Sequence, residues 1–171
     1  MTNGKALIYV TLCISVLILS SCARPPQESE PAVQIGQPAP NFKLRDLAGR
    51  QVSLDQFKGN VVMLDFWATW CGPCRMTMPV MESLQKEYAN RMVLLTIDLQ
   101  EPLDVVRDYV RAHGIHSIVL LDEEGSVGEV YGASPIPMQF LIDKQGIIRH
   151  VQMGFEPGMA IPLRSQIDRL P

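Results

Sequence analysis

The chain has 171 residues, a length that suits one domain with short appendages. Its hydrophobic fraction of 47% and charged fraction of 19% exclude a disordered chain. The formal net charge of −3 gives no basic footprint for nucleic acid, and the four cysteines are too few and too unevenly placed for a disulfide-stapled scaffold.

The N-terminus is expected to be a targeting signal. Residues 6–19 form an almost wholly apolar run, shorter than the roughly 20 residues that a spanning helix needs but suited to a secretory signal. The following Leu19-Ser20-Ser21-Cys22 resembles a bacterial lipobox, which implies cleavage before Cys22 and lipid attachment to its thiol. The alternative is an uncleaved N-terminal anchor with an incidental cysteine. Both interpretations place the rest of the chain outside the cytoplasm and tethered to a membrane, on the periplasmic side in a Gram-negative cell.

Three segments are therefore expected. Residues 1–21 are the lipoprotein signal peptide. Residues 22–34 contain the lipidated cysteine and a flexible tether, because Pro, Glu, Gln and Ser dominate them and leave too little apolar surface to pack. Residues 35–171 form the folded domain.

The first half of this domain is expected to build one hairpin, one buried strand and one long helix. The predicted elements are a hairpin of residues 42–44 and 51–53, a helical turn at 54–57, a strand at 61–66, and a helix from the C-x-x-C to about residue 89. Pro79 lies inside that helix and is expected to kink it.

The second half alternates strands and helices before a final hairpin. The predicted elements are a strand at 92–97, a helix at 102–113 with Pro102 in its first turn and Gly114 as its C-terminal cap, a strand at 117–121, a hairpin of 140–142 and 147–151, and a terminal helix marked by Leu163, Ile167 and Leu170. This order predicts an α/β sandwich around a central mixed sheet.

The sequence Cys71-Gly72-Pro73-Cys74 is placed for thiol chemistry at a strand-to-helix junction. Unpaired backbone N–H groups and the helix dipole there favour a thiolate, so Cys71 is expected to have a lowered pKa and to be the nucleophile. Cys74 lies in the first helical turn, where it can attack a mixed disulfide and release the substrate. Gly72 permits the tight junction, and Pro73 loses no hydrogen bond in a first turn.

The run DFWATWCGPC, from Asp65 to Cys74, resembles the active-site sequence of thioredoxins. The resemblance implies that Asp65 is the proton acceptor for Cys74. Burial of a carboxyl group beneath a sheet would raise its pKa and agrees with that role, whereas a solvated strand end is the alternative. Trp70 is expected to shield the pair and to form part of the substrate surface.

A wider resemblance covers residues 35–151. The segment IGQPAPNFKL, Phe57-Lys58-Gly59, FWATWCGPCR, Tyr131-Gly132 and Phe140-Leu141-Ile142-Asp143 are similar to the TlpA/ResA-like branch of membrane-anchored thioredoxins. It implies a thioredoxin-like three-layer sandwich with an additional N-terminal β-hairpin. It also implies a cis Pro137 against the disulfide, which leaves the Ile136 backbone free to pair with a substrate; an ordinary trans turn proline is the alternative.

Two positions depart from that family. Thr77 stands where an acidic residue is frequent, and Met138-Gln139 replaces a Thr-Thr or Thr-Ser pair. Both departures are expected near the substrate face, where they leave the chemistry intact and affect the choice of partner.

The resemblance implies an extracytoplasmic thiol–disulfide oxidoreductase that uses no cofactor. The Gly-Pro pair between the cysteines and Ile136 are similar to the reducing members, so reduction of partner proteins is the favoured direction. Protein disulfides, for example during cytochrome c maturation, would be the substrates, and a transmembrane donor would supply electrons.

Three alternatives stay open. One is a zinc site built from the cysteine pair with His113 and His116, although two residues between the histidines is a tight spacing. A second is a copper-binding metallochaperone that uses the cysteines with Met76, Met78, Met81 and Met138. The third is a peroxiredoxin, which the adjacent second cysteine disfavours.

Overall fold

The computed structural model describes residues 33–171, which form one compact unit. The expected signal peptide, the lipid site at Cys22 and almost all of the tether lie outside these residues. Val33 is buried against the domain core, so packing begins two residues before the expected boundary at Ile35. Within the described range, no helix is both long and apolar enough to cross a membrane.

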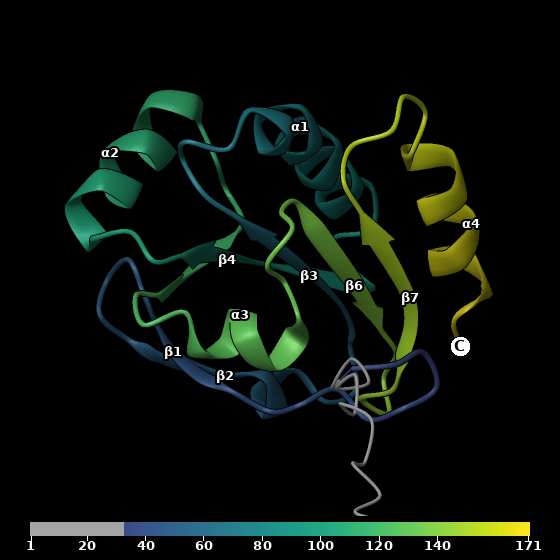
Figure 1. The fold of residues 1–171 in the computed structure, drawn as a ribbon. Coiled ribbons are helices and arrows are strands. Elements are labelled where there is room, and N and C mark those ends of the chain that lie inside the picture. The colour runs from purple at the N-terminus through teal and green to yellow at the C-terminus, as the bar shows by residue number, and fades with distance from the viewer. Residues whose placement is uncertain (1–32) are drawn as a thin grey trace, which may run out of the picture. The chain divides into compact units, whose positions relative to one another are not determined.

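Strands and helices alternate along the chain (Figure 1). In order, the elements are β1 (Lys43–Asp46), β2 (Gln51–Ser53), the 3-10 helix η1 (Leu54–Phe57), β3 (Val61–Trp67), α1 (Gly72–Glu87), β4 (Met92–Leu99), α2 (Leu103–His113), β5 (Ile118–Asp122), α3 (Ser126–Tyr131), β6 (Met138–Ile142), β7 (Ile148–Met153) and α4 (Ala160–Arg169).

The seven strands form one mixed sheet in the order β2-β1-β5-β4-β3-β6-β7. The central strands β5, β4 and β3 are parallel, while β6 and β7 on one side and β1 and β2 on the other pair antiparallel. β3 is buried along its whole length, as expected for a central strand that is covered on both faces. The predicted mixed sheet and N-terminal hairpin are therefore confirmed.

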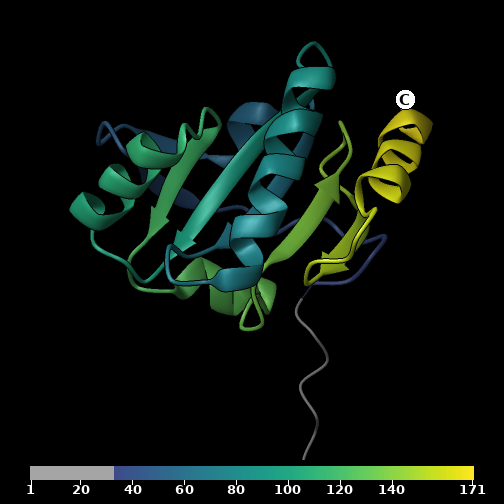
Figure 2. The same cartoon turned by 90° about the horizontal axis from the view of Figure 1, so that it is seen from above.

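Helices cover both faces of the sheet and make three layers (Figures 1 and 2). On one face α1 and α4 pack through Met81, Leu84 and Leu163, and α2 packs beside them through Val106. On the other face α3 packs through Tyr131 against the aromatic side chains of the sheet. This thioredoxin-like α/β fold places the β3–α1 junction at one end of the sheet.

Two details differ from the sequence expectations. Pro102 precedes α2 with an extended ψ of 149°, so the helix begins at Leu103 and the proline lies outside its first turn. The short helix α3 was not expected, because six residues with a central glycine give a weak helical pattern. A Cβ atom at Gly128 would lie 2.8 Å from a methyl group of Leu99, so glycine allows α3 to approach the sheet.

Candidate active site at the β3–α1 junction

The two cysteines form a disulfide at the start of α1. Cys71 is the N-cap residue, and its Sγ accepts a hydrogen bond from the Cys74 backbone N–H at 3.2 Å. Gly72 and Pro73 complete the first turn, as the sequence predicted. The positive end of the helix and a backbone donor therefore both face the sulfur of Cys71, and both stabilise a thiolate there.

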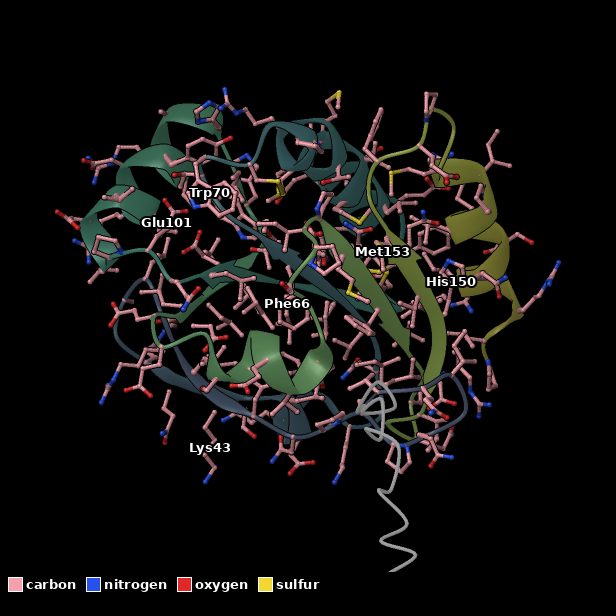
Figure 3. All side chains as sticks on the ribbon, in the orientation of Figure 1. Lys43, Phe66, Trp70, Glu101, His150 and Met153 are labelled. Carbon is pink, nitrogen blue, oxygen red and sulfur yellow. A yellow bond between two sulfur atoms is a disulfide. The ribbon has the colours of Figure 1, made fainter. Side chains whose placement is uncertain are left out.

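Both sulfurs are sheltered, whereas the neighbouring tryptophan is open to solvent. Cys71 is 4% exposed and Cys74 is 2% exposed, but Trp70 is 67% exposed. Trp70 lies on the loop between β3 and α1 (Figure 3). Its indole thus projects beside the disulfide, where it can contact a docked chain.

A cis peptide bond joins Ile136 to Pro137 next to the disulfide. The Ile136 carbonyl oxygen is 3.8 Å from Cys71 Sγ, and Ile136 packs against the hydrophobic cluster that contains both cysteines. The cis geometry expected for Pro137 is confirmed. The backbone of the bend before β6 therefore passes directly beside the sulfur that is expected to react.

Asp65 is fully buried in β3, and the one hydrogen-bond partner of its side chain within residues 33–171 is Gln139. The two residues are paired in register between β3 and β6, and Gln139 Nε2 donates to Asp65 Oδ1 at 2.7 Å. The second oxygen of Asp65 and the side-chain oxygen of Gln139 have no partner in the described part of the chain. Burial raises the Asp65 pKa to about 7, and the bond from Gln139 opposes that rise.

Asp65 lies on the face of the sheet that carries the disulfide. Side chains two residues apart on a strand share a face, so Asp65 and Trp67 point to the same side. Trp67 packs in one cluster with Cys71 and Cys74. A buried carboxyl group with a pKa of about 7 therefore lies on the same face of the sheet as the redox pair.

A second buried carboxyl group supports the loop before Cys71. Glu101 accepts hydrogen bonds from the Thr69 backbone N–H at 2.5 Å and from Thr69 Oγ1 at 2.6 Å. Asp98 lies opposite Trp67 in the β3–β4 register, and burial together with the nearby Glu101 raises the Asp98 pKa to about 9. Figure 3 labels Glu101 close to Trp70, on a neighbouring loop at this end of the sheet.

The sequence reasoning missed three of these residues. Gln139 was noted only as a departure from the family, and neither Glu101 nor Asp98 was singled out. Asp98 had a usable signal, because it comes directly after an apolar run of residues, as Asp65 does. The Gln139 contact joins residues 74 positions apart and depends on the β3–β6 register.

Thr77, which stands where the family often has an acid, is buried in α1. Its Oγ1 donates to the Cys74 carbonyl oxygen at 3.0 Å, so it is satisfied within the helix. The position carries no charge. This leaves Asp65 as the carboxyl group beneath the cysteines on β3.

The methionines proposed for a copper site do not gather at one place. Met81 packs in the cluster beneath α1 and α4, and Met138 packs in the cluster on the opposite face of the sheet. Met78 is next to the cysteines, and Met76 is exposed. The distribution fits core packing and surface exposure rather than a shared soft-metal site.

The residues of the alternative zinc site are also not brought together. His113 Nδ1 is bonded to the Tyr109 carbonyl at 2.9 Å, and its ring stacks on Tyr109. Cys71 and Cys74 are bonded to each other. Within residues 33–171, no three His, Cys, Asp or Glu side chains lie together in a way that could hold a metal ion.

Known proteins resemble this chain in sequence and in structure. The AhpC/TSA family model matches residues 35–151. Thioredoxin-like protein YneN of Bacillus subtilis is 35% identical over 74% of this chain and 76% of its own length. The thiol-disulfide oxidoreductase ResA of Bacillus thuringiensis is 39% identical over 68% of each chain.

Solved structures agree with these sequence relatives. A putative thiol:disulfide interchange protein DsbE from Chlorobium tepidum is 33% identical, with a TM-score of 0.74 over 79% of this chain and 96% of its own. The pneumococcal exposed lipoprotein thioredoxin Etrx1 is 28% identical, with a TM-score of 0.65 over 75% of this chain and 99% of its own. The chain therefore belongs to the AhpC/TSA family of thioredoxin-like proteins and is a thiol–disulfide oxidoreductase close to ResA, with its disulfide between Cys71 and Cys74.

Proposed function

We propose that this protein is a membrane-anchored, extracytoplasmic reductase of disulfides in partner proteins. The observation that carries the proposal is the Cys71–Cys74 pair at the N-terminus of α1, beside the Ile136 carbonyl and above a buried Asp65. Each component has a separate task in dithiol–disulfide exchange.

The reaction starts from the reduced protein. The Cys71 thiolate attacks one sulfur of a substrate disulfide, the substrate S–S bond breaks, and a mixed disulfide forms with release of one substrate thiolate. The Ile136–Pro137 backbone holds the substrate segment beside Cys71. Cys71 must be a thiolate when it attacks. The hydrogen bond from the Cys74 backbone N–H stabilises the negative charge of that thiolate.

Resolution of the mixed disulfide requires a second thiolate. Asp65 accepts the Cys74 proton, and Cys74 then attacks Cys71 and expels the second substrate thiolate. The substrate gains two electrons, and the protein ends with the Cys71–Cys74 disulfide found in the structure. A carboxyl group with a pKa of about 7 suits this exchange, because it is close to the pH at which it must gain and lose a proton.

Trp70, Gly72 and Pro73 complete the substrate surface. The exposed indole of Trp70 offers an apolar contact, and the exposed Gly72 and Pro73 leave room for an approaching chain next to the sulfurs. The substrate can therefore contact the apolar Trp70 indole and the exposed backbone of Gly72 and Pro73.

The location is proposed from the sequence. The lipobox-like Leu19-Ser20-Ser21-Cys22 supports a signal peptide of residues 1–21, lipid attachment to Cys22, and a tether that reaches to residue 34. A structural relative is itself described as an exposed lipoprotein thioredoxin. A transmembrane donor would then return two electrons to the disulfide, and the family resemblance of residues 35–151 makes partners in cytochrome c maturation candidate substrates.

The redox potential of the cysteine pair tests the direction. We expect equilibration in glutathione or dithiothreitol buffers to give a value near about −250 mV or lower, which is characteristic of reductases. A value above roughly −180 mV would instead identify an oxidase or isomerase. Replacement of Cys22 by alanine tests the lipid site, because the native protein should incorporate labelled fatty acid and the variant should not if Cys22 carries the lipid.

A further inference from the structure

A groove of about 700 Å³ begins beside the redox pair and runs toward α3. Trp70 and Ile136 form its end nearest to Cys71, and Gln100, Gly132 and two glutamates line the remainder. The volume is in the range of pockets that hold several side chains.

The groove is continuous with the position of the reacting sulfur. Ile136, whose carbonyl oxygen is 3.8 Å from Cys71 Sγ, is one of the residues that line the groove. An extended chain advances about 3.3 Å per residue, so a substrate cysteine at Cys71 places its neighbours one to three positions away inside the groove.

The groove lining also includes a side-chain amide that can form hydrogen bonds. Gln100 is exposed and has a φ of 60°, the one positive φ outside glycine in residues 33–171. Such a conformation is costly for a residue with a side chain and is concentrated at functional sites. The Gln100 amide lies over Gly125, where it can donate to and accept from a peptide backbone.

The groove lining contains two charged side chains, and both are negative. Glu124 and Glu129 are exposed and line the groove, and neither makes an ion pair within residues 33–171. The lining contains no lysine or arginine. A cationic side chain in this part of the groove would meet exposed carboxylates and no competing lysine or arginine of the lining.

We propose that this groove binds an extended segment of the protein substrate that carries a lysine or arginine within about three residues of its reactive cysteine. The inference rests on the proposed function, because the same Cys71 must attack the disulfide of the bound segment. Glu124 and Glu129 act here as specificity residues, and Cys71 carries out the chemistry.

The test compares single-turnover rates of the reduced protein with matched disulfide peptides. The peptides differ only at the positions flanking one cysteine, which hold lysine, glutamine or glutamate. Oxidation is followed by the fluorescence of Trp67 and Trp70, the two tryptophans of the chain. We expect the lysine peptide to react about fivefold faster than the glutamate peptide at low salt, since each exposed charge pair contributes a factor of a few, and we expect the ratio to shrink as salt is added.

Two double variants separate the groove from the net charge of the protein. E124Q/E129Q should reduce the lysine-to-glutamate ratio toward one. E123Q/D108N removes the same number of charges from exposed positions outside the groove and should leave the ratio unchanged. Equal rates with all peptides, or equal loss of preference in both double variants, would overturn the proposed groove specificity. Absence of reaction with every peptide would overturn the reductase function itself.

Discussion

The hydrogen bond from Gln139 to Asp65 predicts how the pH profile of the reaction responds to one substitution. Gln139→Leu keeps a similar volume but removes the single donor that the described structure gives to the Asp65 carboxylate. A hydrogen bond to a charged group contributes about 1.5–3 kcal/mol. Because 1.36 kcal/mol corresponds to one pKa unit, the Asp65 pKa should rise by about one to two units above its value of about 7.

The assay is the rate at which Cys74 resolves a preformed mixed disulfide on Cys71, measured from pH 5 to 10. Asp65 must be ionised to accept the Cys74 proton, so the rate should increase around pH 7 in the native protein and at a pH about one to two units higher in Gln139→Leu. Gln152→Leu is the matched control. Gln152 pairs with Gln139 across β6 and β7, but its amide donates to the Met153 carbonyl.

An unshifted or acid-shifted profile in Gln139→Leu would refute the reasoning. The first result would mean that the amide does not favour the charged carboxylate, and the second would mean that it favours the protonated form. An equal shift in Gln152→Leu would assign the effect to the apolar content of the sheet rather than to the hydrogen bond.

Three further predictions concern the same site. Cys74→Ser should accumulate covalent complexes with substrate proteins, whereas Cys71→Ser should accumulate none; non-reducing electrophoresis distinguishes them, and equal trapping would contradict the assigned roles. The Asp65 pKa is raised in the folded state, so stability is greatest when the group is protonated and decreases as the pH rises from about 4 to about 7. Urea unfolding at pH 5 and pH 8 should show that Asp65→Asn removes the part of this loss that falls between these pH values, about 3 kcal/mol, and an unchanged pH dependence would contradict it. Glu101→Gln should weaken the anchoring of Thr69 by about 1–3 kcal/mol and accelerate hydrogen exchange of the Thr69 amide, and an unchanged exchange rate would show that the loop is held by other contacts.

The sequence allowed correct prediction of elements that have a strong local pattern. The apolar run from Val61 identified β3, and the cysteine spacing after it placed the start of α1. The thioredoxin-like fold and the cis Pro137 came from the family resemblance, and the structure confirms both.

The remaining features depend on pairing between distant segments. Gln139 reaches Asp65 only because β6 pairs antiparallel with β3 in one particular register. Glu101 reaches Thr69 because the loops after β3 and β4 leave the same end of the parallel strands. Neither contact leaves a periodic pattern in the sequence, so a single sequence does not distinguish these residues from other polar residues.

The shelter around Cys71 and Cys74 affects how selectively electrons are delivered. Cysteine residues that expose only a few per cent of their surface are poorly reached by small oxidants from solution. A partner segment that aligns with the Ile136 backbone brings its own sulfur next to Cys71. The fold therefore slows oxidation of the reduced cysteines by small molecules. It still permits rapid thiol–disulfide exchange with a protein segment that docks beside Cys71.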